Sequence, residues 1–252
     1  MASGQGRHAP GVASDTTGQQ VAVRVESLHA GYGESYVLHN VTFRVRPGEI
    51  FAILGKNGMG KSTLLKAMMG FLSRREGHIE LLGFDVTRWL PYQITRHGVG
   101  YVPQERAIFQ DLLVEENLRL AVVGRPRWKE RLDVVARWFP AVALRRRQRA
   151  GTLSGGEQKM LLMARALLAE PRLLLVDEIS EGLQPAIIDR LREILAEERQ
   201  RADLTIILVE QNVRFALGLA DRYAVLKSGR IVDSGEASPE ARTRVERHLA
   251  AF

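Results

Sequence analysis

The sequence predicts an α/β fold with a mainly parallel core sheet, an antiparallel β subdomain and an inserted helical subdomain. Apolar strands and amphipathic helices alternate over much of the chain, which is typical of a parallel sheet whose strands are joined by helices. A glycine-rich loop stands between one buried strand and one helix. A long middle stretch shows helical periodicity, so it predicts a separate lobe.

The first quarter of the chain predicts a tail followed by three strands. Residues 1–20 are rich in Gly, Ser, Thr and Gln and contain no apolar run, which predicts a disordered tail. Alternating polar and apolar residues predict half-buried strands at Val21–Glu26 and Val41–Val45, with the turn at Gly31–Gly33 between them. The run Ile50–Leu54 is continuously apolar, as expected for a strand buried on both faces.

The middle of the chain predicts the helical lobe, over about residues 105–168. Its candidate helices are Val114–Val122, Pro126–Trp138 and Gly155–Leu168.

The remainder returns to alternating strands and helices, which predicts further strands of the parallel sheet. Apolar residues at helical spacing predict a C-terminal helix over about residues 238–252. The other predicted elements are strands at Leu173–Val176 and Leu204–Val209, helices at Pro185–Gln200 and Val213–Ala220, and short strands at Tyr223–Leu226 and Arg230–Asp233.

Composition limits the class of protein. The chain of 252 residues is 45% hydrophobic and 26% charged, so it can bury a substantial core. It has no cysteine, and its six histidines show no zinc-type spacing, so any metal should be held by oxygen atoms. Its longest apolar stretches are far shorter than the roughly 20 residues that cross a bilayer as a helix. With no secretory signal at residues 1–20, we expect a soluble protein in the cytoplasm.

The net charge of +7 raises the question of an acidic partner, because four arginines cluster at Arg145, Arg146, Arg147 and Arg149. Nucleic acid or an acidic membrane surface would fit such a cluster. No aromatic residues are interleaved with it to stack on bases, however, and the rest of the excess charge is spread along the chain. We therefore expect a solvated face and no nucleic-acid partner.

The loop Gly55–Ser62 matches G-x-x-x-x-G-K-S and lies between the strand Ile50–Leu54 and a predicted helix at Lys61–Met69. Its backbone N–H groups are expected to bind the phosphates of ATP, while Lys61 reaches the terminal phosphates and Ser62 binds Mg²⁺. A plain glycine-rich turn is the alternative, weakened by the strand and helix on either side. The predicted nucleotide-binding residues here are Gly55, Lys56, Asn57, Gly58, Met59, Gly60, Lys61, Ser62 and Thr63.

Two acidic residues follow the apolar strand Leu173–Val176. Asp177 is predicted to hold Mg²⁺, through water, and Glu178 to polarise the water that attacks the γ-phosphate. The pair could instead only favour a following helix N-terminus, but the apolar strand and the phosphate loop make that the weaker interpretation. Together the two motifs predict a P-loop NTPase.

A third motif, Leu153–Gln158, predicts a second anion site at the start of a helix. One nucleotide does not need two such sites from one subunit, so we expect a head-to-tail dimer in which this segment closes over the ATP of the other subunit. Taken alone, Ser-Gly-Gly would more simply be a helix cap. The predicted ATP-contacting residues of this segment are Ser154, Gly155, Gly156 and Gln158.

From about Val21 to Phe252, the order of these motifs resembles the ATP-binding subunits of ABC transporters. The resemblance implies one ABC ATPase domain over residues 21–252. It also implies that Tyr32 stacks on adenine, and that Gln104, in Tyr-Val-Pro-Gln, contacts Mg²⁺ or the attacking water. Gln104 would further link the nucleotide to membrane subunits, through a surface that includes Glu105–Glu116. Without the resemblance, Tyr32 would be an ordinary aromatic and Gln104 a solvated side chain.

Two departures from the family pattern narrow the resemblance. Gln211 stands where most members have a histidine that contacts the γ-phosphate, and Gln184 stands where an aspartate is usual; Ile179 also replaces a common proline. An amide can donate a hydrogen bond to phosphate but cannot carry a proton. The two glutamines, together with Tyr-Val-Pro-Gln and Val-Glu-Glu-Asn-Leu, look like the subfamily that imports branched-chain amino acids, with urea and short-chain amide importers close to it. That subfamily uses them normally, so we expect an active Mg²⁺-dependent ATPase.

The resemblance implies a motor subunit at the cytoplasmic face of the inner or plasma membrane. Its partners would be a second ATP-binding subunit, identical or paralogous, transmembrane permeases, and indirectly a solute-binding protein. A non-transport ABC ATPase would usually carry two cassettes or a long insertion, which 252 residues do not contain. An exporter would usually have an acidic, glycine-containing stretch where Arg145–Arg149 lies. The transported solute is not encoded in this chain.

Overall fold

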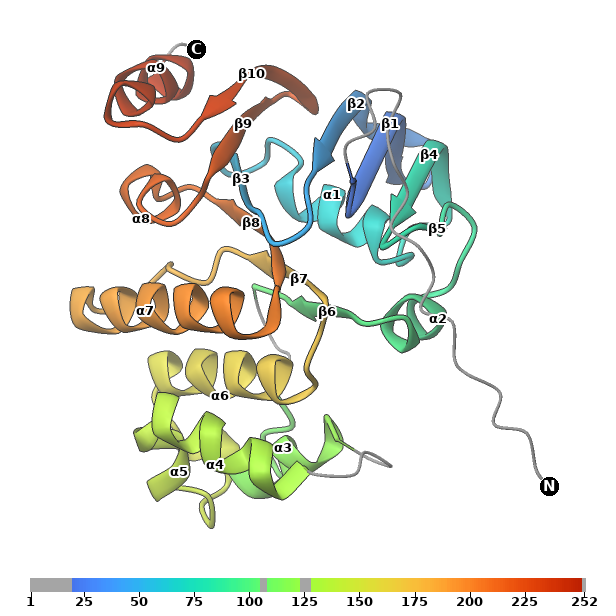
Figure 1. The fold of residues 1–252 in the computed structure, drawn as a ribbon. Coiled ribbons are helices and arrows are strands. Elements are labelled where there is room, and N and C mark those ends of the chain that lie inside the picture. Colours follow the sequence, from blue (N-terminus) through green and yellow to red (C-terminus); the bar gives the residue numbers. More distant parts are fainter. Residues whose placement is uncertain (1–19, 105–107, 123–127, 251–252) are drawn as a thin grey trace, which may run out of the picture.

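The computed structural model describes residues 20–104, 108–122 and 128–250, so nearly all of the predicted tail, residues 1–20, lies outside the described residues. The described chain forms two sheets with helices around and between them (Figure 1). No helix among the described residues has the length and apolar character needed to span a bilayer.

The core sheet has six strands, five of them parallel and the sixth, β10, antiparallel to β9. Its spatial order is β10 (Arg230–Glu236), β9 (Arg222–Lys227), β3 (Ile50–Leu54), β8 (Thr205–Glu210), β7 (Leu173–Asp177) and β6 (Val99–Val102).

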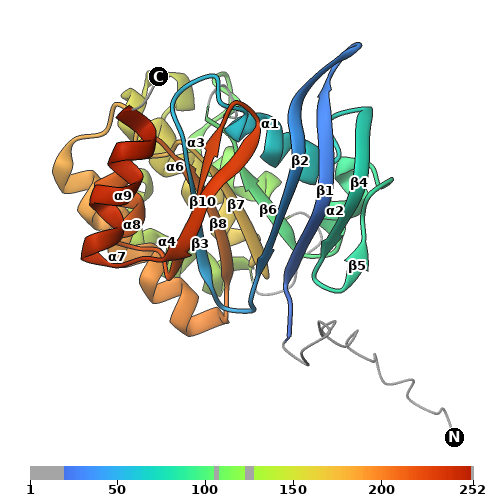
Figure 2. The same ribbon diagram turned by 90° about the horizontal axis from the view of Figure 1, so that it is seen from above.

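A second, antiparallel sheet stands beside the core sheet, with α1 (Lys61–Met68) between them (Figure 2). Helix α1 buries Leu64, Leu65 and Met68 in the core that the two sheets share. The strands of this sheet, in spatial order, are β2 (Ser35–Val45), β1 (Val23–Tyr32), β4 (Arg74–Leu81) and β5 (Phe84–Asp85).

Strand β3 shows why the core strands are apolar without interruption. Side chains alternate between the faces of a strand. Phe51 and Ile53 therefore pack in the core shared with α1 and the antiparallel sheet, while Ile50, Ala52 and Leu54 pack in the core on the other face. Both faces are covered, so no position of β3 is free to be polar.

The other helices, apart from α2, cover the second face of the core sheet and extend beyond it, whereas α2 packs Ile94 in the core shared with α1. Four of them, α3 to α6, gather at one end of the molecule, and α7 lies between α6 and the sheet (Figure 1). The helices are α2 (Pro91–Arg96), α3 (Val114–Leu120), α4 (Trp128–Trp138), α5 (Pro140–Leu144), α6 (Gly155–Leu168), α7 (Pro185–Ala202), α8 (Val213–Leu217) and α9 (Pro239–Ala250), with a 3-10 turn at Ala150–Thr152.

A buried ion pair joins this group of helices to α7. Arg131 of α4 contacts Glu198 of α7, and these side chains are only 6% and 1% exposed. The same guanidinium donates to the carbonyl oxygen of Leu167, at 3.2 Å. Arg201 also donates to Glu198, at 2.7 and 2.8 Å. Helix α4 is thus tied to the ends of both α6 and α7.

Several predicted elements are confirmed at the residue level. The strand Ile50–Leu54 and the helix Gly155–Leu168 have their predicted bounds, and the strands and helices after Leu173 differ by a few residues at their ends. Helix α4 starts at Trp128, so the predicted start at Pro126 falls outside the described residues.

Other elements differ from the prediction. Strand β1 continues to Tyr32, because beyond its register shifts it still pairs with β2 and β4. The turn is therefore shorter than predicted. No strand was predicted at β4 or β6, since only Ile79 and Leu81 of β4 reach the core and β6 has four residues.

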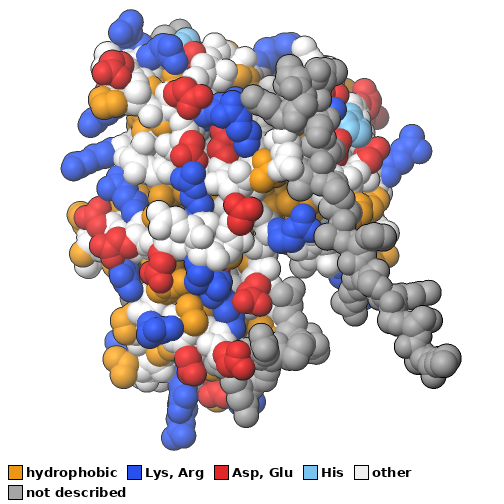
Figure 3. Space-filling view, in the orientation of Figure 1, with side chains coloured by type: hydrophobic (Ala, Val, Ile, Leu, Met, Phe, Trp, Pro, Cys, Tyr) orange, Lys and Arg blue, Asp and Glu red, His pale blue; other side chains and the backbone are white. Residues whose placement is uncertain are grey.

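Charged side chains of both signs are interspersed on the face shown in Figure 3. Arg145, in the arginine cluster, forms an ion pair with Glu157 at 3.0 Å, so part of that cluster's charge is balanced within the chain.

Candidate nucleotide-binding and catalytic site

The phosphate loop is shaped by glycines at backbone angles that other residues avoid. Gly60, the N-cap residue of α1, has φ +101°, and Gly58 has φ +79°. A Cβ on Gly60 would lie 2.9 Å from a methyl carbon of Leu38, so a side chain there would also require the buried Leu38 of strand β2 to shift. The β9–β10 turn holds the loop from outside, since the Gly229 N–H donates to the carbonyl oxygen of Met59 at 3.1 Å. The glycine conformations and this backbone bond together fix the path of the loop as it enters the N-terminus of α1.

Lys61 lies at the centre of this loop with its side chain 3% exposed. Its ammonium donates to the carbonyl oxygens of Gly55 and Lys56, both at 2.8 Å, and forms an ion pair with Glu178 at 2.8 Å. A buried ammonium at a helix N-terminus is well placed to bind phosphate oxygens. To reach them it would exchange some of these oxygen partners.

Ser62 and Asp177, both predicted to hold Mg²⁺, lie in hydrogen-bond contact beside Lys61. The Ser62 hydroxyl donates to Asp177 Oδ1 at 2.9 Å, and the Tyr101 hydroxyl donates to Oδ2 at 3.3 Å. Burial raises the pKa of Asp177, and its hydrogen bonds to Ser62 and Tyr101 oppose that rise. Burial, with Asp177 beside it, also raises the pKa of Tyr101.

The chemistry of this pair fits Mg²⁺, which takes oxygen ligands from one or two protein groups and completes its shell with waters and substrate phosphates. No group of three or more His, Cys, Asp or Glu side chains in the described ranges is arranged to hold a metal by protein ligands alone. A hydroxyl and a carboxylate next to a phosphate loop are the donor set that such a shared ion needs.

Glu178 follows Asp177 in a left-handed backbone conformation, with φ +45°. Non-glycine residues rarely adopt that conformation, and the Glu178 N–H is held by the carbonyl oxygen of Val209 at 3.0 Å. Its carboxylate is 7% exposed, with Oε1 on Lys61. Oε2 accepts from the Gln104 amide at 2.8 Å, and that amide also donates to Glu181 at 2.8 Å. Gln104, which was predicted only from the resemblance, is therefore in contact with Glu178, the predicted base.

The segment Ser154–Gln158 forms the N-terminus of α6. Ser154 caps the helix by a reciprocal pair of bonds with Glu157: the Ser154 N–H donates to the carboxylate at 2.9 Å, and the Glu157 N–H donates to the hydroxyl at 3.3 Å. The Gln158 amide donates to the carbonyl oxygen of Leu153 at 3.0 Å. The helix cap considered as an alternative is therefore present, and Ser154 and Gly155 are exposed at a helix end that can also receive an anion.

Tyr32 and Gln211, both predicted to contact the ATP bound by this same chain, lie apart from the contact group of Lys61, Ser62, Gln104, Asp177 and Glu178. Tyr32, at the end of β1, is 49% exposed, and Gln211, directly after β8, is exposed. No hydrogen bond or ion pair within the described ranges links either side chain to that group.

Five residues that were not predicted as site residues also take part: Tyr101 and Glu181 contact the group itself, and Lys159, Ser180 and Glu210 make contacts that hold the turn 178–181 after it. Lys159 of α6 points its ammonium at the carbonyl oxygens of Glu178, Ile179 and Glu181. A sequence signal existed for Glu210, which ends an apolar strand as Asp177 does.

The family model described as ABC transporter matches residues 38–181, which is more than half of the chain. The chain belongs to the ABC transporter family.

Curated relatives of this ABC cassette cover most of its length. The high-affinity branched-chain amino acid transport ATP-binding protein BraG of Pseudomonas aeruginosa is 43% identical over 210 residues, covering 82% of this chain and 90% of its own length. The probable branched-chain amino acid transport ATP-binding protein LivF of Archaeoglobus fulgidus is 38% identical over 218 residues, covering 86% and 92%.

Solved structures support the same fold for this ABC ATPase. A chain described as an ATP-binding subunit of an ABC transporter superposes with a TM-score of 0.81 at 28% identity, over 91% of this chain and 100% of that one. A nucleotide-free ATP-binding cassette from an ABC transporter has the same TM-score, 0.81, at 22% identity, over 92% and 98%, and so speaks for the fold alone.

Proposed function

We propose that this chain is the ATP-hydrolysing subunit of an importer for branched-chain or other hydrophobic amino acids. The observation that carries the proposal is the contact group in which Lys61, Ser62, Asp177, Glu178 and Gln104 meet. The similarity to BraG and LivF, both named for branched-chain amino acid transport, supports this class of solute over urea or short-chain amides. In this proposal residues 21–252 form one ATPase domain with a helical subdomain inserted at about 105–168, after a disordered tail.

The phosphates of ATP would bind along Gly55–Thr63, at the N-terminus of α1. Lys61 would exchange Glu178 and the loop carbonyls for phosphate oxygens, because a triphosphate carries more negative charge than one carboxylate and two neutral carbonyls. Tyr32, exposed at the rim, would stack on adenine. Ser62 and Asp177 would hold Mg²⁺, with Gln104 near it, and the ion would supply positive charge against the terminal phosphates.

Loss of the Lys61 contact would release one carboxylate oxygen of Glu178. That oxygen could then accept a proton from water, or orient the water, in line with the γ-phosphate. The Gln104 amide, already 2.8 Å from the other oxygen, would fix the carboxylate's direction. Gln211 would donate an amide hydrogen bond to the γ-phosphate and carry no proton itself.

The site would be completed by a second ATP-binding subunit, identical or paralogous. Its Ser154, Gly155, Gly156 and Gln158 would approach the γ-phosphate from the opposite side. Two observations support this arrangement. Ser154 and Gly155 are exposed. The capping bonds of Ser154 also hold it at the N-terminus of a 14-residue helix, which is the positive end of the helix dipole.

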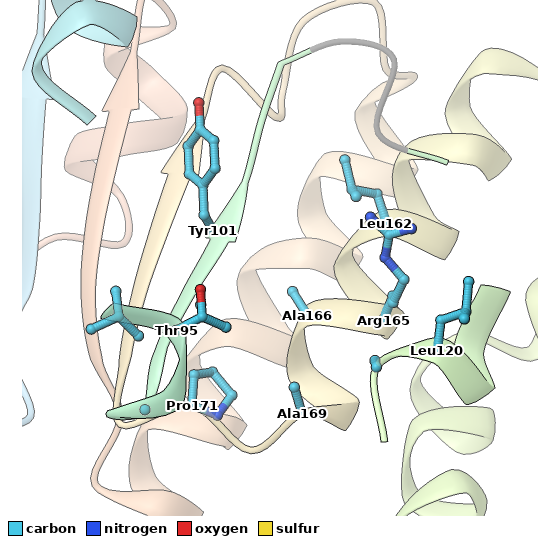
Figure 4. A pocket seen from close by; sticks show the side chains of 12 residues that line it. Thr95, Tyr101, Leu120, Leu162, Arg165, Ala166, Ala169 and Pro171 are labelled. Atoms are coloured by element: carbon cyan, nitrogen blue, oxygen red, sulfur yellow. The ribbon is translucent and has the colours of Figure 1, made fainter. Parts of the chain in front are cut away.

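Permease subunits would dock between the core sheet and the helices α3 and α6. A cavity of about 270 Å³ lies there, with Thr95 and Pro171 on one side and Leu120 and Arg165 on the other (Figure 4). Tyr101 lines this cavity, and its hydroxyl contacts Asp177. A partner bound in the cavity would therefore contact a side chain that itself contacts the site. The chain would then sit at the cytoplasmic face of the membrane and reach the solute-binding protein only indirectly. Part of the predicted contact surface Glu105–Glu116, residues 105–107, lies outside the described residues.

Phosphate release by the purified chain, measured with and without Mg²⁺, tests the ATPase. Glu178→Gln should abolish turnover and Gln211→Ala should weaken it. Unchanged turnover in the Glu178 variant would contradict the assignment of the base. Two polytopic permeases recovered with the chain from membranes would support import, whereas ribosomal or DNA-repair proteins would support the alternative of a non-transport ABC ATPase.

A further inference from the structure

Glu210 is a buried carboxyl with no role in the mechanism above. It ends strand β8, its residue is 2% exposed, and both of its side-chain oxygens are used by one residue. Oε1 accepts from the Ser180 N–H at 2.9 Å, and Oε2 accepts from the Ser180 hydroxyl at 2.8 Å. Burying a carboxyl is costly unless such bonds offset it. Glu210 and Ser180 therefore form a specific two-point contact between segments 30 residues apart in the sequence.

The topology of the core sheet explains why this contact can matter. Strand β8 lies between β3, which leads into the phosphate loop, and β7, which ends at Asp177. The end of β8 holds both neighbours through its backbone. The Gly55 N–H donates to the carbonyl oxygen of Glu210 at 3.2 Å, and the Glu178 N–H donates to that of Val209 at 3.0 Å. The phosphate loop and the turn after β7 therefore share one support.

The turn 178–181 is the part of the site that most needs support, because Glu178 is held in a left-handed conformation. Ser180 stands two residues after it and is itself buried. On the side of α6, the Lys159 ammonium donates to the carbonyl oxygens of Glu178 and Ile179 in the same turn, both at 3.4 Å. Glu210 and Lys159 thus clamp the turn between β8 and α6.

We propose that Glu210 is a positioning residue for ATP hydrolysis, which acts through Ser180 to hold the turn that carries Glu178. This rests on the proposed function, because it takes Glu178 as the base. Gln211 follows Glu210 directly, so the clamp also fixes the residue proposed to contact the γ-phosphate relative to the base. The Gly55 N–H, at the start of the phosphate loop, bonds to the Glu210 carbonyl oxygen and not to its side chain, so a change of that side chain should have little effect on ATP binding.

Substitutions at position 210 can show whether Glu210 acts by its hydrogen bonds to Ser180 or only by its negative charge. A glutamine at position 210 can accept from the Ser180 N–H with its carbonyl oxygen and donate to the Ser180 hydroxyl with its amide nitrogen. Glu210→Gln therefore preserves both bonds, whereas Glu210→Ala removes both and Ser180→Ala removes one.

The test measures kcat and KM for ATP in the full chain, with its permeases where turnover requires them. Glu210→Ala and Ser180→Ala should each lower kcat, the former about tenfold, which is about 1.4 kcal/mol in the barrier. KM should stay within about twofold, and Glu210→Gln should retain most of kcat. The double variant Ser180→Ala/Glu210→Ala should be no slower than Glu210→Ala, because both changes break the same contact.

Three results would overturn the proposal: wild-type kcat in Glu210→Ala, a double variant whose loss is the product of the single losses, or Glu210→Gln as slow as Glu210→Ala. Should Glu210→Ala fail to fold, the Ser180→Ala and Glu210→Gln pair still decides, with slow and near-normal turnover expected respectively. Failure of the proposed function is a different result, since the wild-type chain would then release no phosphate or Glu178→Gln would remain active.

Discussion

The buried ion pair of Arg131 and Glu198 allows a quantitative prediction about how the helices α3–α6 are joined to the core. Glu198→Ala removes the carboxylate and leaves the Arg131 guanidinium, 6% exposed, without its closest acidic partner. Removing one partner of a buried pair costs about 3–5 kcal/mol, because the remaining charge stays desolvated. Glu170 remains 3.5 Å from Arg131, and the Leu167 carbonyl oxygen still accepts from it at 3.2 Å. We therefore expect the lower end of this range, about 3 kcal/mol.

The assay is the free energy of unfolding from urea titration of the full chain without nucleotide, with the slope m compared between variants. Glu246→Ala is the matched control. It breaks the ion pair with Arg242, in which both side chains are half exposed, so it should cost less than about 0.5 kcal/mol. A double variant, Arg131→Met/Glu198→Leu, should recover most of the stability lost in Glu198→Ala, because it leaves no buried charge at this position.

A loss below about 1 kcal/mol in Glu198→Ala, or a loss equal to that of the control, would refute this reasoning. A double variant as unstable as Glu198→Ala would do so as well, since the cost would then come from lost packing and not from an unpaired charge.

Two further predictions concern the phosphate loop and the buried carboxyl beside it. Gly60→Ala should weaken ATP binding and destabilise the chain by about 1–3 kcal/mol, because φ is +101° and the new methyl would lie 2.9 Å from Leu38; wild-type nucleotide affinity by fluorescence titration would contradict it. Burial raises the pKa of Glu210, so the folded chain binds this proton more tightly than the unfolded chain, and the group's contribution to stability falls as pH rises from the usual glutamate pKa to the raised one. The always-neutral Glu210→Gln should therefore gain stability relative to the wild type as pH rises above the usual glutamate pKa in urea titrations, and a difference that stays constant with pH would count against it.

The sequence was most informative where one periodicity covered a whole element. Ile50–Leu54 and Gly155–Leu168 each carry a single pattern from end to end, and the structure has them at those bounds. Strand β4 reads Arg-Arg-Glu-Gly-His-Ile-Glu-Leu and is a strand because β1 pairs with it, which is a fact about a partner distant in the sequence. Propensity alone does not determine such a strand.

The same distinction applies to the candidate site. Local motifs were enough to predict Lys61, Ser62, Asp177 and Glu178, and two of the contacts among them are observed, at 2.8 and 2.9 Å. The contact of Gln104 with Glu178 depends on β6 lying beside β7, and the residues concerned are 74 positions apart. Neither strand carries a local signal of that neighbourhood.

The order of the core strands explains why the missed residues lie where they do. In a parallel sheet the carboxyl ends of all strands meet at one edge, so each strand end near the site can contribute a side chain. The order β3, β8, β7 makes the end of β8 the only one of these three that touches both of the others. Residues there are linked by backbone hydrogen bonds both to Gly55 of the phosphate loop and to Glu178, although their own side chains need not contact a ligand. Glu210 and Gln211 occupy that position. In the proposed function, the Glu210 carboxylate, bonded twice to Ser180, would keep this strand end rigid, and Gln211 would donate a hydrogen bond to the γ-phosphate in place of the usual histidine.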